Sequence, residues 1–189
     1  MKRKYKDYYE MKTVETPGGT RRIPVYIGRY YRCDATEGAR RSFAWSVLLL
    51  AVLAMAFLIA AGLQNGDFSR TFYITLPYAA QFLPVVFLIS ASFEFMATKG
   101  DLTEPDHRSK FVRIRTMSLT GLIFAGMTIT GSVVYTILQK MEIRTDDLLF
   151  LFFTIIIGSI LGIIHFMQQK MNKCIKINED NQSNIDDKN

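Results

Sequence analysis

The stretch FAWSVLLLAVLAMAFLIAAGL, residues 43–63, contains no charged residue over 21 consecutive positions. Three more uncharged blocks follow at 71–93, 116–139 and 148–164. A helix rises about 1.5 Å per residue, so roughly 20 apolar residues cross a hydrocarbon layer about 30 Å thick. A chain of 189 residues has too little other mass to cover four helices that are apolar on every side. The sequence therefore predicts an all-α integral membrane protein built as a four-helix transmembrane bundle.

These blocks divide the chain into three parts. Residues 1–33 form a cytoplasmic N-terminal segment, 34–169 a four-span membrane domain, and 170–189 a cytoplasmic tail whose end has little apolar content and is expected to be disordered. Asp34, followed three residues later by Glu37, is a capping-box pattern that predicts the start of a helix leading into the first span. We place the spans at about 43–63, 72–97, 114–138 and 147–168.

Lysine and arginine fall mostly on one side of the predicted spans. Residues 1–42 carry 11 of them, the 98–115 loop carries 5 and the C-terminal tail carries 4. Only Arg70, Lys140 and Arg144 fall on the other side. Because positively charged connections stay in the cytoplasm, both termini are predicted to be cytoplasmic. One membrane crossed in this orientation fits a multi-pass protein of a bacterial plasma membrane.

The N-terminal segment has local structure of its own. Residues 11–32, MKTVETPGGTRRIPVYIGRYYR, place two runs rich in β-branched and aromatic residues on either side of a Pro-Gly-Gly turn at 17–19. This pattern predicts a β-hairpin, and Pro24 favours an edge or irregular second strand. An isolated hairpin is marginal in water. We therefore expect it to rest on the membrane surface, the 98–115 loop or another protein.

The same segment interleaves cations with aromatic side chains. In free solution this composition would suggest single-stranded nucleic acid, because aromatics stack on bases and cations follow phosphates. Beside a membrane, anionic lipid headgroups are the nearer acidic partner. We therefore expect no nucleic acid, and contact with the lipid surface or a protein partner through Arg21, Arg22, Tyr26, Arg29, Tyr30 and Tyr31.

Small residues recur at helical spacing in the third and fourth spans. Gly121, Ala125 and Thr128 share one face of the third, and Gly158 and Gly162 form a G-x-x-x-G match in the fourth. Helices in lipid associate through close packing, so small residues mark where backbones approach. We expect these residues to pack helices within one chain, and a homo-oligomer face is the alternative.

Two prolines, Pro77 and Pro84, fall in the second span. Each removes a backbone donor and crowds the preceding turn, so a kink is expected there. Interrupted helices line binding sites in transporters, but kinks of this kind also occur in scaffolds.

Glu94 lies near the cytoplasmic edge of the second span, and His165 lies at a similar depth in the fourth. Three interpretations compete for this carboxylate. The favoured one is an ion pair with Arg115 or an approach to the headgroups. The second is a structural contact with His165. The third is a proton- or ion-coupled site, because ionisable residues inside a membrane are functional candidates.

Motifs for enzyme chemistry are not found in the sequence. It contains no pair of intramembrane acids, no H-E-x-x-H, no G-x-S-x-G and no P-loop. Cys33 and Cys174 are isolated from each other and from a histidine pair, so neither a zinc site nor a redox pair is indicated. We therefore expect a non-enzymatic protein without a metal or cofactor.

The leading functional hypothesis is an accessory or partner subunit of a larger membrane assembly, which contacts its partner through the cytoplasmic hairpin and the basic loop. The alternative is a small oligomeric transporter or channel. Its path would use the helix kinked at Pro77 and Pro84 and the level of Glu94 and His165.

Overall fold

Four helical spans form the main body of the molecule. The computed structural model describes residues 9–16, 19–26, 30–33, 36–97, 102–103, 112–139, 144–172 and 175–178. Within these ranges, Gly38–Gly62, Phe72–Met96, Val112–Leu138 and Thr145–Asn172 are long and apolar enough to cross a membrane. The prediction of four helices that are long and apolar enough to cross a membrane is therefore confirmed.

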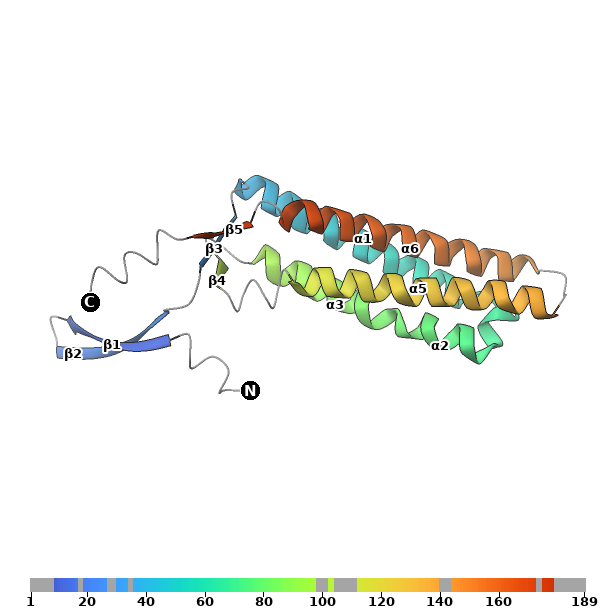
Figure 1. The fold of residues 1–189 in the computed structure, drawn as a ribbon, viewed down its shortest axis with the longest axis horizontal. Coiled ribbons are helices and arrows are strands. Elements are labelled where there is room, and N and C mark those ends of the chain that lie inside the picture. Colours follow the sequence, from blue (N-terminus) through green and yellow to red (C-terminus); the bar gives the residue numbers. More distant parts are fainter. Residues whose placement is uncertain are drawn as a thin grey trace.

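The second span differs from the other three because it is two helices. The first, third and fourth spans are α1 (Glu37–Gly62), α5 (Val112–Gln139) and α6 (Thr145–Asn172). The second span consists of α2 (Phe72–Ala80) and α3 (Phe82–Met96), and Gln81 stands between them (Figure 1).

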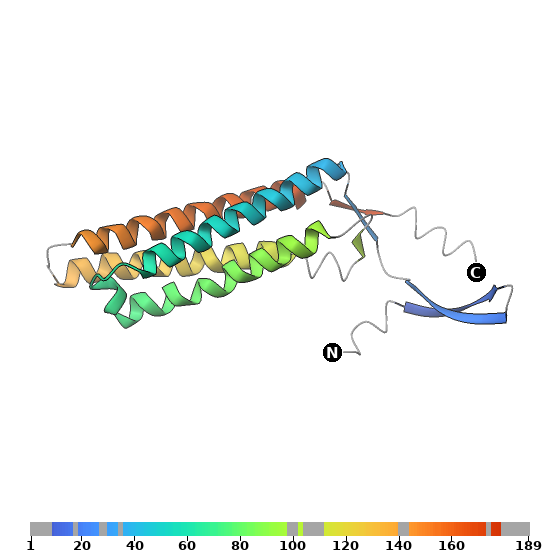
Figure 2. The same ribbon diagram turned by 180° about the vertical axis from the view of Figure 1, so that it is seen from behind.

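The spans pack as a ring of four. Helix α1 packs against α3 and α6, while α5 packs against α2, α3 and α6. Helices α3 and α6 are therefore diagonal to each other, as are α1 and α5. We call the end where α1 and α5 begin and α3 and α6 finish the termini end, and the end that carries the 63–71 connection the connection end (Figures 1 and 2).

The interior of this bundle holds an apolar core with several buried polar side chains, and many other large apolar side chains face outward. Leu49, Leu83 and Ile137 are 69%, 64% and 68% exposed. On α1 the small side chains face inward, and Ala44, Ala51, Ala54 and Ala61 are fully buried. The buried polar side chains are Gln81, Ser92, Ser118, Thr128, Ser132, Asp147, Thr154 and Gln168. This distribution suits a hydrocarbon solvent, in which polar groups must find partners within the protein.

Helix α1 begins directly after Thr36, whose hydroxyl accepts a hydrogen bond of 3.3 Å from the Ala39 backbone N–H. The predicted cap, Asp34, lies outside the described residues. Thr36 takes the role because it immediately precedes the first helical residue, where a side-chain oxygen can reach the free N–H groups of the first turn.

The connection end is fastened by a buried carboxylate. The 63–71 connection contains the short 3₁₀ helix η2 (Phe68–Arg70), and the Phe68 backbone N–H donates to Asp147 Oδ1 at 2.9 Å. Asp147 lies in the first turn of α6 and is 3% exposed. The Phe68 ring packs edge-on against Tyr135 and Phe150, with centroids 5.6 and 6.3 Å away. An acid in the first turn of a helix is also favoured by the helix dipole.

Gly66 makes this contact possible, and its replacement tests it. A Cβ at Gly66 would lie 2.2 Å from Asp147 Oδ1 and 3.2 Å from the Asp147 backbone nitrogen. We expect Gly66→Ala to lower the free energy of unfolding by about 1–3 kcal/mol, as overpacking does in a tight site. Chemical unfolding in mixed micelles, followed by circular dichroism, measures this loss.

Gly126→Ala is the matched control for that prediction, because nothing lies within 4 Å of the added Cβ and the residue sits in the interior of α5. Alanine favours a helix over glycine by about 1 kcal/mol, so no loss is expected there. Equal stability of the two variants would contradict close contact between Gly66 and Asp147.

Two strands precede the bundle in the chain. Strand β1 (Tyr9–Thr16) pairs antiparallel with β2 (Gly19–Tyr26), from Tyr9 opposite Tyr26 to Thr16 opposite Gly19. In both views these strands lie beyond the termini end, away from the helices (Figures 1 and 2).

A second small sheet lies at the termini end itself. Strand β3 (Tyr30–Cys33) is central and pairs antiparallel with β4 (Leu102–Thr103) on one side and β5 (Ile175–Asn178) on the other. Strand β3 precedes α1, β4 lies between α3 and α5, and β5 follows α6. Three segments far apart in the sequence therefore meet here, which the sequence pattern did not predict.

Candidate functional site

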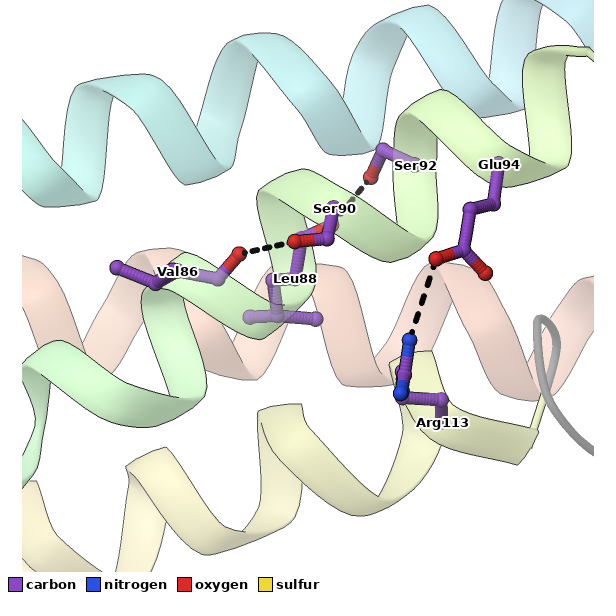
Figure 3. Close-up of polar contacts among 6 residues, drawn as sticks. All are labelled: Val86, Leu88, Ser90, Ser92, Glu94 and Arg113. Carbon is purple, nitrogen blue, oxygen red and sulfur yellow. Dashed lines mark hydrogen bonds and ion pairs between the residues drawn. The ribbon is translucent and has the colours of Figure 1, made fainter. Parts of the chain in front are cut away.

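Glu94 forms an ion pair across the α3–α5 interface. Its Oε1 lies 3.4 Å from Arg113 Nη1, and the two side chains are 46% and 35% exposed (Figure 3). The Arg113 guanidinium also lies over the Phe87 ring, 5.6 Å from its centroid. The pair therefore lies on the bundle surface near the termini end, with its cation resting on an apolar ring.

The partner of Glu94 here is Arg113, whereas the sequence analysis favoured Arg115. Residues two positions apart in a helix do not share a face. Arg113 faces α3, and Arg115 is exposed on α5. Figure 3 also shows that the neighbouring hydroxyls of Ser90 and Ser92 donate to carbonyls of their own helix, at 3.1 and 2.8 Å.

His165 belongs to a different set of contacts. Its Nδ1 lies 3.2 Å from Ser118 Oγ, and its Nε2 lies 3.0 Å from Gln169 Nε2. Ser118 Oγ also donates to the Arg115 carbonyl at 3.0 Å. If Ser118 uses its proton on that carbonyl, Nδ1–H donates to Ser118 and the Nε2 lone pair accepts from Gln169. Both ring nitrogens thus have partners within α5 and α6.

Glu94 and His165 lie at similar depths but do not meet. Among the residues the structure describes, Glu94 forms no hydrogen bond or ion pair with His165 or Arg115. The physical reason is the ring order of the bundle, which places α3 and α6 on a diagonal. The depth of each residue along its span could be estimated from the sequence, but the order of the helices around the ring could not.

Loss of the Glu94 charge should have little effect on stability. We expect Glu94→Gln to change the free energy of unfolding by less than about 1 kcal/mol, because exposed ion pairs contribute about 0–1 kcal/mol. The measurement is chemical unfolding in micelles, with Arg113→Gln as the matched variant. A loss of several kcal/mol from either variant would mean that this carboxylate is far more constrained than its exposure indicates.

Gln81, which stands between α2 and α3, carries a buried side-chain amide. Gln81 is fully buried, and its Nε2 donates to Thr128 Oγ1 at 3.3 Å. The Thr128 hydroxyl in turn donates to the Phe124 carbonyl at 2.9 Å, so it can still accept from Gln81. Gln81 Oε1 is buried and has no hydrogen-bond partner in the described part of the chain.

Proline chemistry explains why the helix breaks at this point. Pro77 and Pro84 stand four residues before and three residues after Gln81. Neither can donate to the carbonyl four residues before it, which for Pro84 is Ala80. The Gln81 backbone N–H is shared between the carbonyls of Pro77 and Tyr78, at 3.2 and 3.1 Å. The predicted kink is therefore a division into α2 and α3, and Gln81 is a residue that sequence reasoning missed.

A signal for Gln81 was present in the sequence. It is the only side-chain amide in the uncharged block at 71–93, and both prolines lie within four residues of it. Amide side chains inside membrane helices form bonds between helices. An amide between two prolines could therefore have predicted both the interruption of the helix and a hydrogen bond from Gln81 to a neighbouring helix.

Opposite effects are expected from the two members of the Gln81–Thr128 contact. Gln81→Leu removes a buried unpaired oxygen, so we expect the free energy of unfolding to stay unchanged or to rise. Thr128→Val leaves the whole amide without its partner and should cost about 1–3 kcal/mol. Chemical unfolding of both single variants and of the double variant measures the coupling. Additive effects in the double variant would contradict the contact.

The small residues predicted to pack helices differ in how closely another helix approaches them. A Cβ at Gly121 would lie 2.8 Å from Leu161 Cδ1, and one at Gly158 would lie 3.6 Å from Ala125 Cβ. Ala125 is 2% exposed, and Thr128 is fully buried. Gly162 differs, because nothing lies within 4 Å of an added Cβ. Its spacing from Gly158 matches a motif, but only Gly158 lies where α5 and α6 approach.

Cations surround the termini end of the bundle, and several rest on aromatic rings. The Arg40 guanidinium lies 5.8 Å from the centroid of Phe95, and Lys170 Nζ lies 4.8 Å from that of Phe166. Arg41 and Arg115 are exposed at the same end. Long cationic side chains that cover rings in this way keep their charges at a membrane surface.

Five of the six predicted surface-contact residues lie on the strands, and the sixth lies outside the described residues. Arg21, Arg22 and Tyr26 are in β2, and Tyr30 and Tyr31 are in β3. Arg22 is exposed. The sixth, Arg29, lies between these strands in the part of the chain that is not described.

Comparison of the chain with protein-family models, with curated proteins and with solved structures finds no match. Across the described ranges, no three His, Cys, Asp or Glu side chains are grouped so that they could hold a metal ion. Any assignment of function therefore depends on the residues and contacts given above.

Proposed function

We propose that this protein is a non-enzymatic, accessory or partner subunit of a larger membrane assembly, and that its termini end carries the contact surface. The observation that carries the proposal is the β4-β3-β5 sheet. Its three strands are connected in the chain to all four spans at the termini end. A partner bound to this sheet would therefore be attached to every span of the bundle.

The sheet also offers backbone groups to a partner. Since β3 is central, the outer edges of β4 and β5 have no strand beside them within the described sheet. An open strand edge can pair with an extended segment of another protein, with main-chain hydrogen bonds supplying affinity. Strands β1 and β2, which pair only with each other among the described strands, add two further edges.

Orientation and lipid contact are part of the same proposal. The termini end carries Arg40, Arg41, Arg113, Arg115 and Lys170 on its described helices. Each basic residue near an anionic leaflet contributes about 1 kcal/mol. We assign this end to the cytoplasmic face of a bacterial plasma membrane, with anionic headgroups around the helices, and we expect no nucleic-acid partner.

Truncations distinguish the sheet from the first two strands as the contact surface. Removal of residues 1–26 deletes β1 and β2, whereas removal of residues 1–33 also deletes the central strand β3. We expect the shorter truncation to keep a partner that co-purifies with the full chain in mild detergent, and the longer one to lose it. The measurement is mass spectrometry of the material captured on a C-terminal tag.

The proposal fails if the full chain captures only itself, or if both truncations keep the partner. Circular dichroism in detergent serves as the control for folding, since both truncations retain the four spans. Loss of the partner already with the shorter truncation would move the contact surface to β1 and β2.

A small oligomeric transporter or channel is the second candidate, and the break at Gln81 favours it. Gln81 Oε1 is buried without a hydrogen-bond partner among the described residues and lies at an interrupted helix, and polar groups at interrupted helices line transport paths. Flux assays in proteoliposomes that contain the purified chain test this candidate. Flux that Gln81→Leu abolishes, while Glu94→Gln alters its pH dependence, would support a path through both levels.

A further inference from the structure

An outward-facing groove lies between α5 and α6 near the connection end. Its volume is about 170 Å³, and it is lined by both helices and by Phe68 of η2. Phe68 is buried and forms the floor, whereas Val133, Ile137 and Leu148 are 46%, 68% and 51% exposed and form the rim. The groove therefore opens on the face of the bundle that the apolar exterior assigns to lipid.

The groove presents an apolar surface although two hydroxyl residues line it. Ser132 donates to the Thr128 carbonyl at 2.9 Å, and Thr136 donates to the Ser132 carbonyl at 3.0 Å. Both protons are used within α5, so the groove offers no free donor to a ligand. An apolar cavity of about 150 Å³ holds a molecule the size of benzene. The occupant that fits here is a short stretch of hydrocarbon chain.

A cation stands one helical turn beyond the rim. Arg144 immediately precedes α6 and is exposed, and its carbonyl accepts the Leu148 backbone N–H at 3.1 Å, so its backbone lies one helical turn before Leu148 of the rim. In the first turn of α6, Asp147 is buried and accepts from the Phe68 N–H, and Asp146 is half-buried, so Arg144 is the exposed ionic side chain at this helix start. A guanidinium at a membrane surface binds a phosphate through paired hydrogen bonds.

We propose that the groove and Arg144 together bind one phospholipid molecule. The Arg144 guanidinium contacts the lipid phosphate, and a segment of one acyl chain lies over Phe68 between Val133, Ile137 and Leu148. This site is at the opposite end of the bundle from the β4-β3-β5 sheet. Its failure would leave the proposed partner contact untouched.

Native mass spectrometry of the full chain, released from detergent micelles with phosphatidylglycerol or phosphatidylcholine added, measures lipid retention. Val133→Phe fills the groove, and Val134→Phe is its matched control because Val134 is 42% exposed on α5 but does not line the groove. We expect Val133→Phe to lower retention of both lipids by about tenfold and Val134→Phe to leave it unchanged.

The charge is tested separately. Arg144→Gln should lower retention by about tenfold, the loss expected for one charge-assisted contact. Arg70→Gln is the matched control, because Arg70 is exposed at the same end, donates to Asn65 Oδ1 at 3.1 Å and does not line the groove, so it should leave retention unchanged. Should Val133→Phe fail to fold by circular dichroism, Thr136→Leu fills the same groove from another position. The proposal is overturned if the groove and charge variants retain as much lipid as the unchanged protein. It is also overturned if they lose lipid only to the same extent as their control variants.

Discussion

The physical constraint on which this structure depends is the absence of water around its middle. In hydrocarbon, a polar group without a partner costs several kcal/mol, so each polar group of a span must bond inside the protein. The hydroxyls of Ser92, Ser132 and Thr154 meet that demand by donating to carbonyls of their own helices. These bonds use the hydroxyl protons within each helix, and the small side chains leave room for neighbouring helices to pack.

The same constraint makes contacts between helices informative. Tyr78 of α2 donates to the Leu58 carbonyl of α1, and Gln81 donates to Thr128 of α5. These two bonds attach the divided span to both of its neighbours at almost the same level of the chain. A helix that has lost donors to Pro77 and Pro84 is thereby held by its side chains where its own ladder is weakest.

Much of the fold could be predicted from the sequence because hydrocarbon sets a simple length rule. Uncharged blocks such as 43–63 and 116–139 predicted spans, and the structure gives helices there. Contacts between helices could not be predicted, because they depend on the order of the ring. A choice between Arg113 and Arg115 as partner of Glu94 depends on which face of α5 meets α3, and spacing alone did not decide it.

Two further differences have physical causes of the same kind. Asp147 was not singled out from the sequence, yet it is buried and accepts a hydrogen bond from the Phe68 backbone N–H. Gly162 matched a packing motif, yet nothing lies within 4 Å of a Cβ added there, whereas a Cβ added at Gly158 would lie 3.6 Å from Ala125 Cβ. A motif marks a residue that can allow close approach, and the neighbouring helix decides whether it does.

The break at Gln81 has a consequence for how the two ends of the bundle can influence each other. A continuous helix would carry a displacement of α3 at the termini end directly to the 63–71 connection. The Gln81 backbone stays helical and its carbonyl still accepts the Val85 N–H at 3.3 Å, but Pro77 and Pro84 remove two bonds of the ladder, so the span bends more easily here than a continuous helix. The connection end is fastened independently, through Phe68 and Asp147 to α6. The contacts of Tyr78 with α1 and of Gln81 with α5 therefore oppose any bending of the span at this point.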